Sequence, residues 1–129
     1  MQRLRRPERG SASTEAVLLT PVLLFLVMLV VQFGLWYHAE HVVQAAAQEG
    51  VRSARIEGST ADAGRTRAIE FLRVSGPTII QDPAVTASRD ADTATVEVRG
   101  HAVTVVPGFS LPVSAKATSP VERFREDGG

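Results

Sequence analysis

The chain has 129 residues, enough for one ordinary domain or for a small domain with an appendage. Its 14 basic and 14 acidic side chains cancel, which argues against binding nucleic acid through bulk positive charge. The absence of cysteine excludes disulfides, thiol nucleophiles and thiolate metal sites. The charges are nevertheless segregated: residues 1–15 carry a net +2, residues 16–37 carry none, and residues 38–129 carry a net −2.

The uncharged stretch of 22 residues, 16–37, contains seven Leu, five Val and two Phe. As a helix it is about 33 Å long, slightly more than the thickness of about 30 Å that a bilayer core has. A chain this short is unable to surround such a stretch on all sides as a buried core helix. The stretch therefore predicts a transmembrane helix, which we assign to residues 11–37.

The flanks of this helix indicate its orientation. Residues 1–10 form a short Arg-rich leader, and positively charged segments next to a span stay in the cytoplasm. Trp36 and Tyr37 lie at the other end, where aromatic side chains favour the membrane interface. We expect a single-pass protein of the cell membrane with a cytoplasmic N-terminus and an extracytoplasmic C-terminal domain.

A cleaved secretory signal is the alternative, because Ala45-Ala46-Ala47 satisfies a small-x-small cleavage pattern and the mature chain would then begin at Gln48. The apolar stretch, however, exceeds the usual length of a signal peptide's apolar region. Small and apolar residues also continue through the supposed site at helical spacing, which predicts an extension of the helix over residues 38–57. They are Val42, Val43, Ala46, Ala47, Gly50, Val51 and Ala54.

The junction before the apolar stretch carries the most specific pattern. The leader ends at Gly10, four small residues follow, and Glu15 stands fifth after Gly10 at the start of the apolar helix. This arrangement resembles type IV prepilin-like processing sites and, over roughly residues 8–57, the TadE-like pseudopilins of Tad (tight-adherence) pilus systems. The resemblance implies that a prepilin peptidase cuts after Gly10 and that Ser11 becomes the mature N-terminus. It also implies that Glu15 pairs with the N-terminal amine of a neighbouring subunit.

The residues themselves support two interpretations of Glu15. A carboxylate at the edge of an apolar helix is costly without a partner, and the usual reason to keep one there is function. Alternatively, Ser13 or Thr14 caps the helix, and Glu15 is favoured by the helix dipole. The two interpretations can coexist. Further along, Pro21 removes one backbone hydrogen bond inside the span, which predicts a helix kink.

Residues 58–122 are predicted to form a small α+β domain, followed by a polar tail at 123–129. Ser59 or Thr60 can cap a second helix over 61–75, which Gly76-Pro77 ends. Alternating apolar and polar residues then predict an antiparallel sheet of three to four strands, with one face covered by the amphipathic helix. The segments are 94–99, 103–105 and 111–118, with 85–88 as a weaker candidate. The predicted fold class is therefore α+β and pilin-like, with a long N-terminal helix that extends out of the membrane.

The sequence contains no catalytic pattern. His38 and His41 form an H-x-x-H pair without further ligands, and the nucleophile-elbow, P-loop and dinucleotide-binding motifs are absent. We expect no enzymatic activity, no metal, no cofactor and no small-molecule substrate. The predicted function is a minor pseudopilin or assembly factor of a Tad-type pilus or secretion system. It would associate laterally with other pseudopilins or pilus components through its membrane helix. The alternative is a signal-anchored, exported binding domain unrelated to pili.

Overall fold

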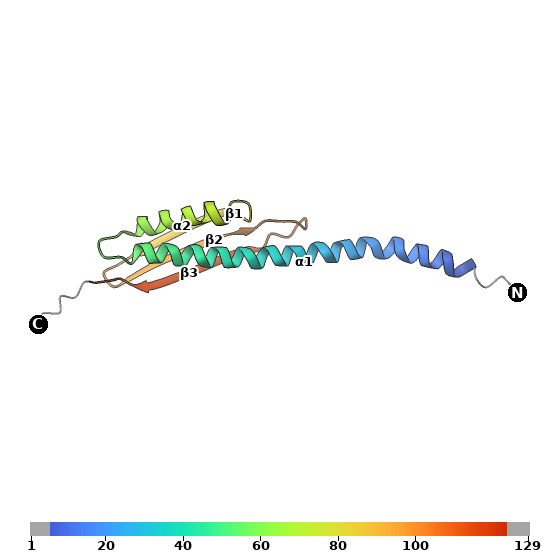
Figure 1. Ribbon diagram of the computed structural model, residues 1–129, viewed down its shortest axis with the longest axis horizontal. Helices are drawn as coiled ribbons and strands as arrows, with labels where there is room; N and C mark the ends of the chain where they lie inside the picture. Colours follow the sequence, from blue (N-terminus) through green and yellow to red (C-terminus); the bar gives the residue numbers. More distant parts are fainter. Residues whose placement is uncertain (1–5, 124–129) are drawn as a thin grey trace, which may run out of the picture.

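The structure, a computed structural model, describes residues 6–123, with side chains from residue 12 onward. Two helices precede three strands: α1 (Arg6–Ala54), α2 (Ala61–Ser75), β1 (Ile80–Arg89), β2 (Thr93–Ala102) and β3 (Pro112–Pro120). The C-terminal half of α1 and all of α2 pack against the sheet, whereas the N-terminal half of α1 extends away alone (Figure 1). This architecture confirms the predicted α+β class. We call residues 55–123 the head.

Local backbone geometry explains where α1 ends. Helix α1 ends at Ala54, slightly before the expected end at Ile56 or Glu57, and the chain then turns through Gly58 with φ of 77°. This left-handed conformation favours glycine. Arg89 from β1 binds the turn, because its two terminal guanidinium nitrogens donate hydrogen bonds to the carbonyls of Ser59 and Ile56.

Helix α2 has the predicted bounds. The hydroxyl of Thr60 accepts a hydrogen bond from the backbone N–H of Ala63 at 3.1 Å, so Thr60 is the N-cap, one of the two residues expected. At the other end, the N–H of Gly76 donates to the carbonyl of Leu72 at 2.9 Å. The side chains that α2 buries are Ala68 and Leu72, together with Gly64, which the apolar pattern alone does not single out.

The sheet has the order β1-β2-β3, with both pairs antiparallel. Strand β2 alternates as expected, so that Val96 and Val98 are buried under the helices while Glu97 and Arg99 face outward. The prediction of a strand at 103–105 is wrong, because β2 ends at Ala102 and residues 103–111 form a loop. We call this segment the β2–β3 loop. The Val103 carbonyl and the Val105 N–H instead bond to a side chain of α1.

Strand β1 is longer than the predicted segment and is interrupted by a bulge. Ile80 and Val85 are both buried although they are five residues apart, a spacing that puts side chains on opposite faces of a regular strand. The register shift between Gln81 and Ala84 removes this conflict, because two residues of β1 there face one residue of β2. Asp82 takes a φ of 49° inside the bulge, a conformation that Asp tolerates better than most residues.

The core lies between the sheet and the two helices, and α1 supplies much of it. All seven residues of the predicted stripe from Val42 to Ala54 are buried. Helix α1 crosses α2 at Gly50 and Gly64, where a Cβ added to Gly50 would lie 2.9 Å from the Gly64 carbonyl oxygen and 3.1 Å from Ala68 Cβ. The helices are therefore close enough to exclude any side chain at the crossing.

This crossing predicts opposite effects for two glycine substitutions in the same helix. Gly50→Ala should lower the free energy of unfolding by about 1–3 kcal/mol, because the added methyl group overpacks the contact. Gly34→Ala is the matched control, since a Cβ there meets nothing within 4 Å, and alanine is the better helix former. Chemical unfolding of the detergent-solubilised full chain, followed by circular dichroism, measures both. Equal stability of the two variants would contradict the close crossing.

Candidate functional site: the apolar half of helix α1 and its junction with the head

The N-terminal half of α1 exposes an apolar surface that the head does not cover. Within the described residues, α1 is the one helix long and apolar enough to cross a membrane, and only 6 % of its most apolar window is buried in the protein. Val17 and Val30 are 71 % and 72 % exposed, values typical of a helix without neighbours. We call Ala12–Val31 the anchor segment. At about 1.5 Å per residue it is about 30 Å long, which matches a bilayer core.

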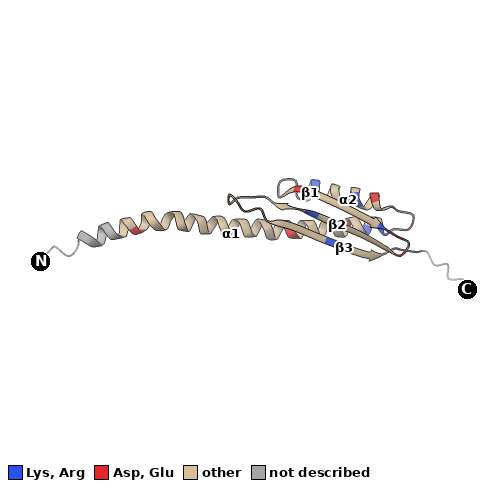
Figure 2. Ribbon diagram, turned by 180° about the vertical axis from the view of Figure 1, so that it is seen from behind, with Lys and Arg blue, Asp and Glu red and all other residues tan. Residues whose placement is uncertain are grey.

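Charge follows the same division. In Figure 2 the charged residues lie mostly on the head and on the part of α1 beside it, and the anchor segment has a single acidic position, Glu15. Glu15 is exposed on α1, and none of the described side chains, residues 12–123, forms an ion pair with it. A lone carboxylate at the end of an apolar helix is unfavourable in a membrane unless a partner neutralises it.

The other predicted positions all lie within α1. The backbone of Gly10 and Ser11 is helical, because α1 begins at Arg6; the Ser11 side chain and leader residues 1–5 lie outside the described parts of the structure. Helix α1 continues through Pro21, and the kink expected there stays a prediction. The hydroxyl of Thr20 donates to the carbonyl of Ala16 at 2.6 Å, so this polar group is satisfied within the helix.

The residue that follows the anchor segment is polar. Gln32 is completely buried, although its neighbours on α1, Val31 and Phe33, are exposed. Its Oε1 accepts hydrogen bonds from the N–H of Val105 at 2.7 Å and of Val106 at 3.2 Å, and its Nε2 donates to the carbonyl of Val103 at 3.1 Å. One side chain thus satisfies three backbone groups of the β2–β3 loop. We call this contact the Gln32 latch.

One turn further along α1, Trp36 continues the contact. Its indole Nε1 donates to the carbonyl of Pro112 at 3.2 Å, at the start of β3. The first hydrogen bond between α1 and the head therefore lies at Gln32, five residues before the expected end of the membrane helix at Tyr37. A glutamine inside an apolar stretch is the signal for such a contact, because a buried amide needs hydrogen-bond partners.

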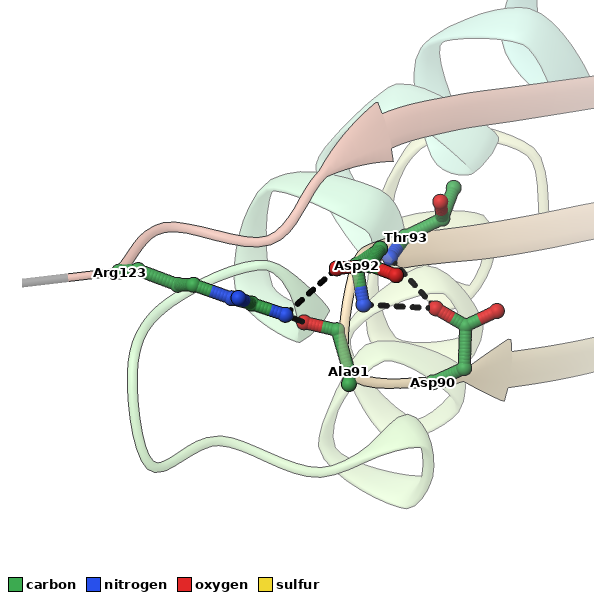
Figure 3. Close-up of polar contacts among 5 residues, drawn as sticks. All are labelled: Asp90, Ala91, Asp92, Thr93 and Arg123. Carbon is green, nitrogen blue, oxygen red and sulfur yellow. Dashed lines mark hydrogen bonds and ion pairs between the residues drawn. The ribbon is translucent and has the colours of Figure 1, made fainter.

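The opposite end of the head contains the other polar cluster of note (Figure 3). The Asp90 carboxylate accepts hydrogen bonds from the N–H groups of Asp92 at 2.8 Å and Thr93 at 2.7 Å, as expected for an Asp in a turn. Arg123 donates to the carbonyl of Ala91 at 2.6 Å and to the Asp92 carboxylate at 2.5 Å. Arg123, which we assigned to the polar tail, is therefore bound to the β1–β2 turn; residues 124–129 lie outside the described part.

Neither the histidine pair nor any other group gathers metal ligands in the described residues. Among residues 12–123, no three His, Cys, Asp or Glu side chains lie close enough to hold a metal ion. The Tyr37 ring packs edge-on against the His41 ring, with centroids 4.6 Å apart. His41 thus contacts an aromatic neighbour one turn away on the same helix face.

These features define a class: a protein with one candidate membrane span at its N-terminus, which is continuous with a helix that packs on a small α+β head. Residues 10–52 match the family model described as TadE-like protein. The matched segment is about a third of the chain and contains Gly10, Glu15, the anchor segment and Gln32. The match confirms the TadE-like resemblance for this segment. No curated protein and no solved structure shows significant similarity to the chain.

The latch predicts a local and a global effect for Gln32→Leu. The substitution leaves the three loop groups without their partner, at a cost of about 1–3 kcal/mol for each buried group that stays unsatisfied. Hydrogen exchange of residues 103–111 in the detergent-solubilised chain should accelerate, and the free energy of unfolding should fall. Gln48→Leu is the matched control, because Gln48 is exposed on the same helix. Unchanged exchange in Gln32→Leu would show that the latch is dispensable.

The Asp90 turn predicts an acid-sensitive contribution to stability. The N–H groups of Asp92 and Thr93 stabilise the carboxylate and hold the pKa of Asp90 below its usual value of 3.8. Because the folded-state pKa is the lower one, this contribution is present above pH 3.8 and lost as the pH falls through the lowered pKa. Asp90→Asn keeps the acceptor oxygen without the charge. Its thermal unfolding midpoint should change less than that of the wild type between about pH 5 and about pH 3; an equal change would refute the assignment.

Proposed function

We propose that the protein is a minor pseudopilin or assembly factor of a Tad-type pilus or secretion system, held in the cell membrane by the anchor segment. The single observation that carries this proposal is the TadE-like match over residues 10–52, which includes the apolar helix left uncovered by the head. A structural role agrees with this family and with a helix whose apolar surface is free for lipid or for other helices.

The orientation follows from charge. The leader contains Arg3, Arg5, Arg6 and Arg9, and such a cluster beside a span favours the cytoplasmic side. The head is then extracytoplasmic, where it presents the polar outer face of its sheet to other components of the machine. On this face Thr95 and Thr118 share a hydrogen bond of 3.3 Å, and Arg99 pairs with Glu97.

Processing is the next element of the proposal. A prepilin peptidase would cut between Gly10 and Ser11, which removes the basic leader and exposes an α-amino group at the start of the mature chain. Both residues lie in a helix, so the protease must unwind it locally. Glycine assists this step, because it destabilises a helix interior by about 1 kcal/mol relative to alanine.

Glu15 gives the exposed amine a partner. With the head in contact from Gln32 onward, the anchor segment must begin near Ala12 to span a bilayer core, and Glu15 then lies inside the membrane boundary. The amine at Ser11 is a cation of the right charge, either one turn away in the same chain or on a neighbouring subunit. Pairing between subunits would neutralise both charges and set the stagger of adjacent helices. The small residues from Ala12 to Thr14 allow the close approach that this requires.

The experiment combines the mature N-terminus with subunit association. The protein recovered from its native host should begin at Ser11 by intact mass and N-terminal sequencing. Glu15→Gln should still be cleaved, but copurification of untagged with tagged copies from native membranes should fall about tenfold, equivalent to about 1.4 kcal/mol. Glu40→Gln is the matched control, since Glu40 lies on α1 beyond the anchor segment.

Each other outcome has a defined meaning. A chain that keeps Met1 is an uncleaved signal anchor, the alternative derived from the sequence. A chain that begins at Gln48 is a secreted domain. Association of Glu15→Gln at the wild-type level would refute the pairing mechanism.

A further inference from the structure

The β2–β3 loop is the part of the head that reaches furthest along α1 toward the N-terminus (Figure 1). The Gln32 latch holds the first half of the loop against the end of the anchor segment. The Trp36 indole donates a hydrogen bond to the carbonyl of Pro112, the residue that directly follows the loop. The loop is therefore fixed at the level where the helix leaves the membrane, if the anchor segment is inserted as proposed.

The composition of this region differs from that of the rest of the head. Residues 102–115 contain no charged side chain, in a chain of which 22 % of the residues are charged. His101 and Lys116 stand just outside the stretch. The uncharged stretch lies on the end of the head nearest the anchor segment, whereas the turn at the opposite end contains Asp90 and Asp92. The lack of charge is confined to residues 102–115, because the start of β1 at the same end of the sheet contains Asp82.

The loop also exposes apolar side chains that a turn facing water does not need. Val105 is 39 % exposed and Phe109 is 37 % exposed. On α1 just beyond the anchor segment, Phe33 and Tyr37 are 54 % and 63 % exposed, so exposed apolar side chains continue along the helix past Gln32, where the loop is bound. Continuity with the membrane-spanning surface identifies lipid as the occupant that these side chains fit.

Several polar backbone groups of the loop already have hydrogen-bond partners within the protein. Gln32 satisfies three of its polar groups, the N–H of Phe109 donates to the Val106 carbonyl at 3.1 Å, and the Thr104 hydroxyl donates to the Phe109 carbonyl at 2.9 Å. Gly108, with φ of 84°, allows the tight turn after Pro107. Backbone groups that already have partners lower the cost of entering the membrane interface.

We propose that the β2–β3 loop lies in the outer interfacial layer of the membrane, with the side chains of Val105 and Phe109 among the lipids. The head then has two attachments to the bilayer, the span itself and this loop, and the two together fix its tilt. The proposal rests on membrane insertion of α1, which belongs to the proposed function.

The absence of cysteine from the chain allows a direct test, because each introduced cysteine is unique. The full chain is labelled with an environment-sensitive fluorophore at Phe109→Cys or Val105→Cys and is reconstituted into vesicles of phosphatidylcholine and phosphatidylglycerol. Leu23→Cys, in the anchor segment, reports insertion of the span. Ala91→Cys, exposed in the turn at the other end of the head, is the matched control for a probe in water.

The expected result is blue-shifted emission and quenching by brominated lipids at positions 109, 105 and 23, but not at 91. Quenching at 23 without quenching at 109 and 105 would overturn the loop proposal and leave the anchor intact. No quenching at 23 would overturn the membrane insertion on which both rest. A blue shift at 109 that brominated lipid does not quench would show that protein, such as a second copy of the chain, covers the loop, and would also overturn the proposal.

Discussion

The buried side-chain amide of Gln32, which follows the anchor segment of α1, is the constraint on which the rest of this structure depends. Gln32 divides α1 into a segment that the protein leaves bare and a segment that it covers. Without partners, the amide would be unfavourable in lipid and in the protein core alike. The β2–β3 loop provides these partners, and in return the loop receives a fixed position on the helix. Gln32 therefore fixes the position of the β2–β3 loop on α1.

The head and the anchor form one folding unit rather than a domain on a tether. The C-terminal half of α1 contributes the buried stripe that covers β2 and β3, and α2 covers β1 beside it. The crossing at Gly50 and Gly64 brings the two helix backbones into contact. A head of this size buries little apolar surface by itself, so it depends on α1 for a core.

Local chemistry explains which elements the sequence predicts well. The cap at Thr60 and the stop at Gly76 define α2, and the stripe from Val42 to Ala54 defines the covered face of α1, because capping and helical periodicity act within a few residues. The resemblance at Gly10 and Glu15 likewise depends on a short motif, and the TadE-like match over residues 10–52 includes both positions.

The features that the sequence does not reveal all depend on contacts between distant segments. Val103 and Val105 alternate like a strand, yet the Val103 carbonyl and the Val105 N–H bond to Gln32, more than 70 positions away. The bulge in β1 places Ile80 and Val85 on one face despite their spacing. Gln32 is the residue that binds the loop at the junction between the anchor segment and the head. An isolated amide in an apolar stretch is the signal that identifies such a residue in a sequence.

The central claim is that α1 crosses the membrane up to Gln32 and carries the head directly above it. Its most direct test is a scan of single cysteines along α1, from Ala12 to His41, with a water-soluble maleimide in native membranes. The account predicts protection from about Ala12 through Val31 and labelling from His38 onward on the extracytoplasmic side alone. Labelling throughout the anchor segment, or release of the chain into the soluble fraction, would contradict it.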